Sequence, residues 1–229
     1  MSDNARYAIY AAPPQGSALA AFGASWLGYD AETGNVLTPP RIEGLTRERW
    51  DDLTRRARHY GFHGTFKAPF ELADGTRPEE LADVASAFAA GRASFDVPLH
   101  LARIGGFLAL TPAEEIPALA DLANGCVERL DRFRRPETPE QVAKRRAGLT
   151  ARQSAHLDRW GYPYVFEEYR FHMTLTDPLA GEESGRLQAA LASLLDPLLA
   201  TPLRIDALCL FRQADRAAPF RLIRRFPLG

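Results

Sequence analysis

Tyr60-Gly-Phe-His-Gly-Thr-Phe-Lys-Ala-Pro-Phe70 aligns without gaps on a second stretch of the chain, Tyr169-Arg-Phe-His-Met-Thr-Leu-Thr-Asp-Pro-Leu179. Tyr, Phe, His, Thr and Pro coincide in register, at an offset of 109 residues. With 5 His and 12 Thr in the chain, chance would supply roughly a quarter of one His-x-Thr triplet. Two such triplets inside one gapless match therefore indicate an internal repeat.

The surroundings of the two stretches repeat as well. Each stretch reads as a strand, and each is followed by a helix and then by a strand pair that begins about thirty residues after the histidine. The first copy comprises strand 62–70, helix 78–90 and strands 95–104 and 107–111; the second comprises strand 165–176, helix 183–199 and strands 203–211 and 220–226. The pattern predicts two β-α-β-β units related by a pseudo-twofold axis, with mainly antiparallel sheets and a mixed α/β (α+β) fold.

We expect these units to form a single bilobal domain over residues 1–229. The first lobe is predicted at about 6–111, a helical insertion at about 112–161, and the second lobe at about 162–229.

Composition excludes several classes of protein. The chain has 229 residues and a net charge of −1, from 28 basic and 29 acidic side chains, so no global basic field exists to hold a long nucleic acid. Two cysteines are too few for a disulfide scaffold or a paired-cysteine metal site. No secretion signal or long apolar run is present, so we expect a cytoplasmic protein with no membrane contact, and a monomer.

Alternation along a strand decides which motif side chains share a face. The aromatic and aliphatic residues of each stretch supply a core face, and the polar residues must meet water, a cleft or a ligand. Two histidines and two hydroxyls in one groove provide a general acid, a general base and donors for an anion between them. The residues of this predicted polar face are His63, Thr65 and Lys67 in the first copy and His172, Thr174 and Thr176 in the second.

The paired motifs resemble those of the 2H phosphoesterase superfamily, which is named for two His-x-Thr/Ser motifs. The flanking sequence is similar to the branch found in bacterial phosphonate-utilisation operons, and the similarity runs over nearly the whole chain. It rests on His63-Gly-Thr-Phe-Lys-Ala-Pro-Phe70, Gly105-Gly-Phe-Leu-Ala-Leu110, Trp160-Gly-Tyr-Pro-Tyr-Val165 and His172-Met-Thr-Leu-Thr176. The resemblance implies a bilobal fold, acid/base roles for His63 and His172, phosphate contacts from Thr65 and Thr174, and catalysis without a metal.

Two positions depart from the pattern of that branch. Gly64 stands where a small alanine is usual, and Tyr29 stands where an arginine often follows Trp-Leu-Gly. Because Gly64 belongs to the core face, we expect its change to be harmless. The change at Tyr29 either removes a charge near the site or has no effect.

Other candidates stay open. Lys67 and Thr176 are either additional phosphate contacts or ordinary strand residues. The arginine-rich stretches 132–135 and 144–152 are either anion contacts or solvated helix faces, and Tyr162 and Tyr164 either stack on a ligand or pack a turn. The chain contains no carboxylate cluster near either motif and no paired cysteines. We therefore expect neither metal nor cofactor.

The first functional hypothesis is hydrolysis of a cyclic phosphodiester in a small ribose-like or nucleotide metabolite. A role in phosphonate metabolism is implied by the resemblance alone. One alternative keeps the chemistry and acts on a 2′,3′-cyclic phosphate at an RNA end. Another is a non-catalytic module that binds phosphate or a nucleotide, which would need neither general acid nor general base.

Overall fold

The computed structural model describes residues 5–229, so residues 1–4 of the predicted domain lie outside the described part. Its nine strands are β1 (Arg6–Ala11), β2 (Gly64–Glu71), β3 (Phe95–Val97), β4 (Leu99–Ile104), β5 (Phe107–Pro112), β6 (Met173–Thr174), β7 (Leu203–Ile205), β8 (Ala207–Gln213) and β9 (Arg221–Pro227). Within this part of the chain the main sheet has the order β4-β5-β6-β2-β1-β8-β9, and β3 and β7 form a second, two-stranded sheet. All the strand pairs are antiparallel.

Helices precede and follow these strands. They are α1 (Ala18–Leu27), α2 (Arg47–Tyr60), α3 (Pro78–Ala90), α4 (Pro117–Leu130), α5 (Pro139–Arg146), α6 (Ala151–Trp160) and α7 (Gly181–Leu199), with short 3₁₀ turns η1 (Asp131–Phe133) and η2 (Phe166–Glu168). Ser17 caps α1 and Thr46 caps α2, because each side chain accepts a hydrogen bond from a backbone N–H in the first turn. Helices and antiparallel strands together confirm the predicted mixed α/β (α+β) class.

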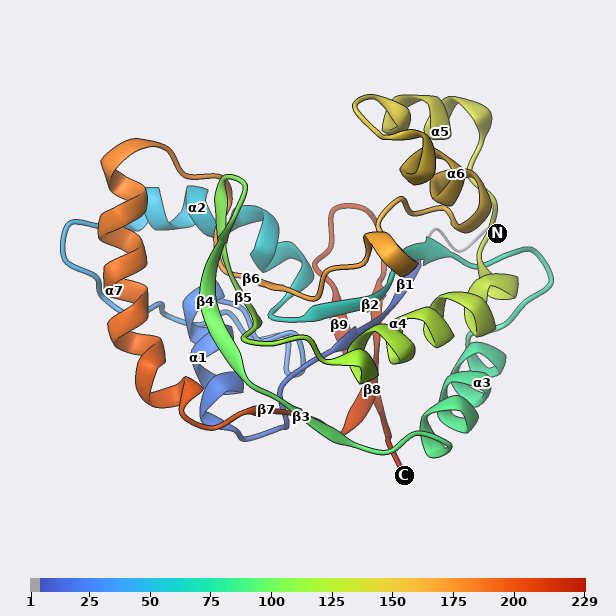
Figure 1. Ribbon diagram of the computed structural model, residues 1–229, viewed down its shortest axis with the longest axis horizontal. Helices are drawn as coiled ribbons and strands as arrows, with labels where there is room; N and C mark the ends of the chain where they lie inside the picture. Colours follow the sequence, from blue (N-terminus) through green and yellow to red (C-terminus); the bar gives the residue numbers. More distant parts are fainter. Residues whose placement is uncertain (1–4) are drawn as a thin grey trace.

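The order of elements after each motif is the same in both copies. β2 is followed by α3, β3, β4 and β5, and β6 is followed by α7, β7, β8 and β9. The long strand predicted at the start of each pair is interrupted once in each copy, at Pro98 and at Asp206. In Figure 1, β2 and β6 lie side by side although they come from distant parts of the chain. The two copies are therefore joined within one sheet, while the pseudo-twofold axis and the lobe boundaries stay predictions.

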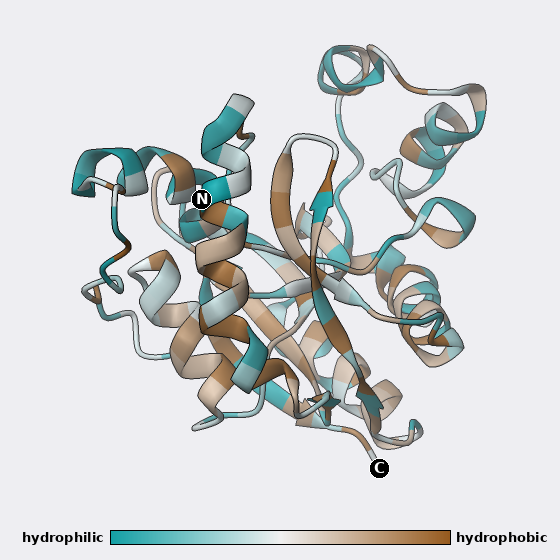
Figure 2. Cartoon of the chain, turned by 60° about the vertical axis from the view of Figure 1, so that its left-hand side comes forward, coloured by the Kyte–Doolittle hydropathy of each residue, from teal (hydrophilic) through white to brown (hydrophobic). Residues whose placement is uncertain are grey.

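The two faces of β1 belong to two different hydrophobic clusters. Tyr7, Ile9 and Ala11 pack into a large cluster with buried residues of α1, α2, α3, α4 and α7. Ala8, Tyr10 and Ala12 belong to a smaller cluster on the other face. Figure 2 shows the corresponding concentration of hydrophobic residues in the strands and on parts of the helices. The helices thus cover one face of the sheet, and the opposite face is available for a functional site.

Two expectations about strands need correction. The strand predicted over 165–176 is reduced to Met173–Thr174: Phe166, with a φ of 54°, starts the turn η2, and pairing with β2 and β5 is confined to Met173 and Thr174. A non-glycine residue with positive φ cannot continue an extended strand. In β2 the register against β1 shifts between Ile9↔Lys67 and Tyr10↔Thr65, which leaves Phe66 as an extra residue. This β-bulge interrupts the simple alternation expected along the strand.

Between β5 and β6 the chain is mainly helical, as predicted for about 112–161. It contains α4, η1, α5 and α6, and Figure 1 shows α5 and α6 standing away from the sheet. Among residues 5–229, no helix combines the length and apolar character needed to cross a membrane.

Candidate functional site

The two motif histidines are held by the same local contact. His63 directly precedes β2 and its Nδ1 lies 2.9 Å from the carbonyl oxygen of Gly61. His172 directly precedes β6 and its Nδ1 lies 2.9 Å from the carbonyl oxygen of Arg170. Because a carbonyl oxygen can only accept, each Nδ1 carries the proton of this bond. Each neutral ring therefore presents a lone pair at Nε2.

The register between β2 and β6 brings the two motifs together. Gly64 and Met173 are the paired residues. Continuing this antiparallel register puts His63 opposite Thr174 and Thr65 opposite His172, all on one face of the sheet. The charge on His172 lowers the pKa of His63, so the two rings are within electrostatic reach of one another.

The environment of His63 favours its neutral form. Its ring stacks on that of Tyr10, with 3.7 Å between the centroids, and Tyr60 lies 6.2 Å away. Burial lowers the pKa of His63 to about 4, although the hydrogen bond to Gly61 opposes this shift. The Oγ1 of Thr65 lies 3.3 Å from Nε2 of His63. At neutral pH this imidazole is a hydrogen-bond acceptor at Nε2.

His172 occupies the β5 side of the same face. β6 also pairs with β5, through Ala109↔Thr174, so the second motif is held between two strands. The ring of Phe107 lies 5.8 Å from that of His172, centroid to centroid. His172 and Thr174 are both half-buried. No group of three or more His, Cys, Asp or Glu side chains that could hold a metal ion occurs among residues 5–229.

Lys67 is not brought to the face of the histidines. It is 4% exposed, and its Nζ donates to the carbonyl of Val127 at 3.3 Å and lies 3.4 Å from Oδ1 of Asp131, at the C-terminal end of α4. Its Cα partner is Ile9, on the helix-covered face, because the bulge at Phe66 reverses the alternation after Thr65. Burial lowers the pKa of Lys67 to about 8.

The hydroxyl of Thr176 also has another partner. Thr176 is 1% exposed, and its Oγ1 accepts a hydrogen bond from the backbone N–H of Leu108 at 3.0 Å. It therefore joins the segment after β6 to β5. The structure brings together His63, Thr65, His172 and Thr174, but gives Lys67 and Thr176 structural contacts elsewhere.

The two departures from the family pattern also have explanations. A Cβ at Gly64 would lie 2.4 Å from the ring of Phe171, which is buried, so glycine leaves the space that this ring occupies, and the harmlessness of the change stays a prediction. The hydroxyl of Tyr29 donates to the carbonyl of Phe220 at 3.1 Å, within the smaller hydrophobic cluster. Tyr29 thus fixes the loop that covers this part of the sheet.

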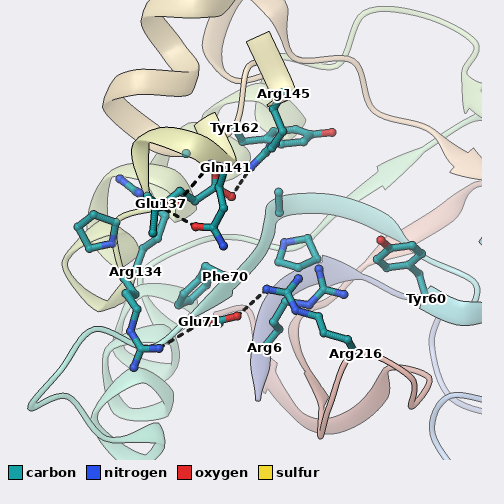
Figure 3. Close-up of a pocket in the computed structure, with 16 residues that line it drawn as sticks. Arg6, Tyr60, Phe70, Glu71, Arg134, Glu137, Gln141, Arg145, Tyr162 and Arg216 are labelled. Atoms are coloured by element: carbon teal, nitrogen blue, oxygen red, sulfur yellow. Dashed lines mark hydrogen bonds and ion pairs between the residues drawn. The ribbon is translucent and has the colours of Figure 1, made fainter. Parts of the chain in front are cut away.

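A cavity of about 540 Å³ lies next to Tyr60, the neighbour of His63. Figure 3 shows it between the sheet, which supplies Arg6 and Glu71, and the helical insertion, which supplies Gln141 and Arg145. We call it the arginine pocket, because its charged lining consists of Arg6, Arg134, Arg135, Arg145, Arg216, Glu71 and Glu137.

The sequence left part of this lining open and missed the rest. Arg134, Arg135, Arg145 and Tyr162 belong to segments already considered as anion or ligand contacts. Arg6 and Arg216 come from opposite ends of the chain and carried no signal. Tyr60 did carry a sequence signal, since it coincides with Tyr169 in the repeat.

Comparison with known proteins relates the chain to larger relatives. It is 41% identical over 230 residues to a protein of Janthinobacterium sp. (strain Marseille) named ribose 1,5-bisphosphate phosphokinase PhnN, covering 98% of this chain and 51% of the relative. A protein of the same name from Laribacter hongkongensis (strain HLHK9) is 36% identical over 219 residues, covering 96% and 51%. The chain thus spans about half the length of the curated relatives it matches.

A solved structure and a family model complete the comparison. The crystal structure of a conserved protein of unknown function from Agrobacterium tumefaciens str. C58 aligns with a TM-score of 0.46 and 13% identity, over 99% of this chain and 89% of that one. The model of the family described as "Protein of unknown function (DUF1045)" matches residues 65–221, a range that includes Thr65, His172 and Thr174, and the chain belongs to this family.

Proposed function

We propose that this protein is a phosphoesterase that opens a cyclic phosphodiester of a small ribose-like or nucleotide metabolite. The observation that carries the proposal is the matched pair of histidines on adjacent strands. Each has its Nδ1 on a carbonyl oxygen two residues earlier, at 2.9 Å, and a threonine hydroxyl two residues later. Such a pair supplies the general base and the general acid of phosphodiester hydrolysis.

His63 is suited to be the base. Its lowered pKa, about 4, keeps Nε2 unprotonated at neutral pH. Nε2 takes a proton from water as the water oxygen forms a bond to phosphorus. One P–O ester bond of the cyclic phosphate breaks, and Nε2–H of His172 protonates the ester oxygen that leaves phosphorus. The product is a phosphomonoester with a free hydroxyl, and the hydroxyls of Thr65 and Thr174 donate to the phosphoryl oxygens.

The names of the relatives support a ribose phosphate as the substrate class. They act, by name, on ribose 1,5-bisphosphate, and opening a cyclic phosphate on a ribose phosphate yields a ribose with two phosphomonoesters. This chain contains no G-x-x-x-x-G-K-[ST] phosphate loop. We therefore assign the kinase reaction of these relatives to the half that this chain does not span. Together with the resemblance of the motifs, this supports a role in phosphonate metabolism.

The test is turnover of a panel of cyclic phosphates: ribose cyclic phosphates, nucleoside 2′,3′-cyclic phosphates and an RNA oligonucleotide with a cyclic end. We expect the small substrates to be hydrolysed, and His63→Ala and His172→Ala each to lose about 10²–10⁴-fold in rate. His100→Ala is the matched control, since His100 is exposed on β4, where its Nε2 lies 3.4 Å from the hydroxyl oxygen of Thr111. Full activity in either motif variant overturns the proposal, and preference for the RNA end identifies the alternative substrate.

A further inference from the structure

The arginine pocket is lined by more arginines than its own glutamates balance, although Asp131 also pairs with Arg134, at 2.8 Å, and Asp74 with Arg135, at 3.0 Å. Five arginines and two glutamates line it, in a chain whose net charge is −1. Glu71 is shared between Arg135, at 3.2 Å, and Arg216, at 2.5 Å. Glu137 lies 2.5 Å from Arg145. Such a concentration of guanidinium groups is the usual means of binding phosphate.

Arg6 adds a cation held by neutral groups. Its Nε donates to the side-chain oxygen of Gln213 at 2.6 Å, and its guanidinium lies 5.2 Å from the ring centroid of Phe220. Burial and the neighbouring charge of Arg216 lower the pKa of Arg6. Figure 3 shows the side chains of Arg6 and Arg216 converging on the same side of the cavity.

One buried side-chain hydroxyl, that of Tyr10, has no hydrogen-bond partner in the described part of the chain. Tyr10 is 0% exposed, and its Oη makes no hydrogen bond within the described residues. The charged or polar groups that act on it are those of Tyr60, Tyr162 and Arg6, all of which line the pocket. The Oε2 of Glu137, on the opposite wall, is likewise buried without a hydrogen-bond partner in this part of the chain. The unpaired Oε2 of Glu137, which lines the pocket, is an acceptor that a ligand hydroxyl can meet.

We propose that the arginine pocket binds a second anionic group of the substrate, a phosphomonoester on the same molecule whose cyclic phosphodiester lies at His63 and His172. This inference rests on the proposed function. An oxygen of the phosphomonoester accepts from Arg145, Arg216 and Arg6, and sugar hydroxyls pair with Glu137. Tyr60 links the two places, because it lines the pocket and its ring centroid lies 6.2 Å from that of His63.

Binding tests the pocket apart from chemistry. In the His172→Ala background, we expect ribose 5-phosphate to bind in a calorimeter and ribose to give no signal. Adding Arg145→Gln or Arg216→Gln should weaken binding of ribose 5-phosphate by at least about tenfold. Arg146→Gln is the control, because Arg146 is also in α5 but pairs with Asp158, at 2.5 Å, and does not line the pocket. Equal affinity in all four proteins, or no binding of ribose 5-phosphate, overturns the inference.

Kinetics tests whether the bound group belongs to the substrate. We expect a nucleoside 2′,3′-cyclic phosphate that also carries a 5′-phosphate to have a kcat/KM about tenfold or more above that of the same compound without it. Arg145→Gln and Arg216→Gln should bring this ratio towards one, while Arg146→Gln retains it. A ratio of one in the wild-type protein refutes the inference and leaves the proposed function intact. If no cyclic phosphate is hydrolysed, the proposed function fails, and the calorimetric result alone decides whether the pocket binds phosphate.

Discussion

Gly64 and Met173 face each other as partners in adjacent antiparallel strands, although they occupy the same position in the two copies of the repeat, 109 residues apart. Each lies between the histidine and the threonine of its own motif. The pairing therefore sets the two His-x-Thr triplets side by side. The core side of Gly64 is also crowded, since the space beside it is filled by Phe171 from the second copy.

The first prediction concerns this close contact. In Gly64→Ala the new Cβ would lie 2.4 Å from the ring of Phe171, which is 6% exposed and has little room to move. We expect the free energy of unfolding to fall by about 1–3 kcal/mol, as in other overpacked cores. Chemical denaturation measures it. Gly185→Ala is the control, because Gly185 lies in α7 with no atom within 4 Å of the added Cβ. That helix should gain up to about 1 kcal/mol. Equal stability of the two variants would contradict the argument.

Much of the fold could be predicted because its signals are local. Strands, helix caps and the two β-α-β-β successions depend on residues close in sequence, and Ser17, Thr46 and the proline in the first turn of α3 mark the starts of their helices. The position of the two motif histidines on neighbouring strands followed from the repeat, because equal motifs on equivalent strands tend to meet.

What the sequence did not reveal depends on long-range packing. The bulge at Phe66 arises from how β2 fits β1, and it alone determines that Lys67 turns to Asp131 instead of joining the histidines. The arginine pocket likewise joins Arg6 to Arg145 and Arg216, which no periodicity connects. Side chains that alternation assigns to one face of a strand are therefore placed correctly only up to the next bulge in that strand.

The second prediction concerns the motif threonines. Thr65→Ala and Thr174→Ala should each lower kcat/KM, because each removes a hydroxyl that donates to a charged phosphoryl oxygen. The expected cost is roughly 1.5–3 kcal/mol of transition-state stabilisation each. Steady-state kinetics on the best cyclic phosphate measures it. Thr65→Ser and Thr174→Ser keep the hydroxyl and should recover most of the loss. Serine variants as impaired as the alanine variants would indicate a packing role.

Lys67→Met gives the third prediction. Lys67 is 4% exposed on the helix-covered side of β2, so its charge does not act on the bound phosphate. We expect turnover to stay near the wild-type level. Folding should survive, because Asp131 keeps its contacts with Arg134, at 2.8 Å, and Arg159, at 3.4 Å. The measurement is kcat/KM beside that of Thr65→Ala. A loss of kcat/KM in Lys67→Met as large as in Thr65→Ala would show that Lys67 acts on the bound phosphate and would contradict this prediction.

Chelation provides the fourth prediction. In the proposed mechanism the charge that develops on the phosphate is met by threonine hydroxyls and by a protonated histidine. Turnover should therefore be the same with and without EDTA, after the protein has been dialysed against the chelator. Loss of activity in EDTA together with recovery on adding a divalent ion would disprove the two-histidine mechanism for this protein.

The last prediction follows from the lowered pKa of His63. The mechanism needs His63 neutral and His172 protonated, so kcat/KM should be bell-shaped in pH, with limbs that belong to the coupled pair. Stability should change as well. His63 has a pKa of about 4 in the folded protein, against about 6.5 in an unfolded chain. Between these values the unfolded state binds the extra proton, so the free energy of unfolding must fall as pH drops from about 6.5 to about 4.

Denaturation at pH 7, 5.5 and 4.5 separates this contribution from those of other groups. His63→Gln lacks the titrating imidazole, so its stability should decline less over this range than that of the wild-type protein. His100→Gln is the matched control, since His100 is exposed, and it should decline as steeply as the wild type. If His63→Gln and the wild-type protein lose stability in parallel, His63 is not held neutral by burial, and its assignment as the general base loses its physical basis.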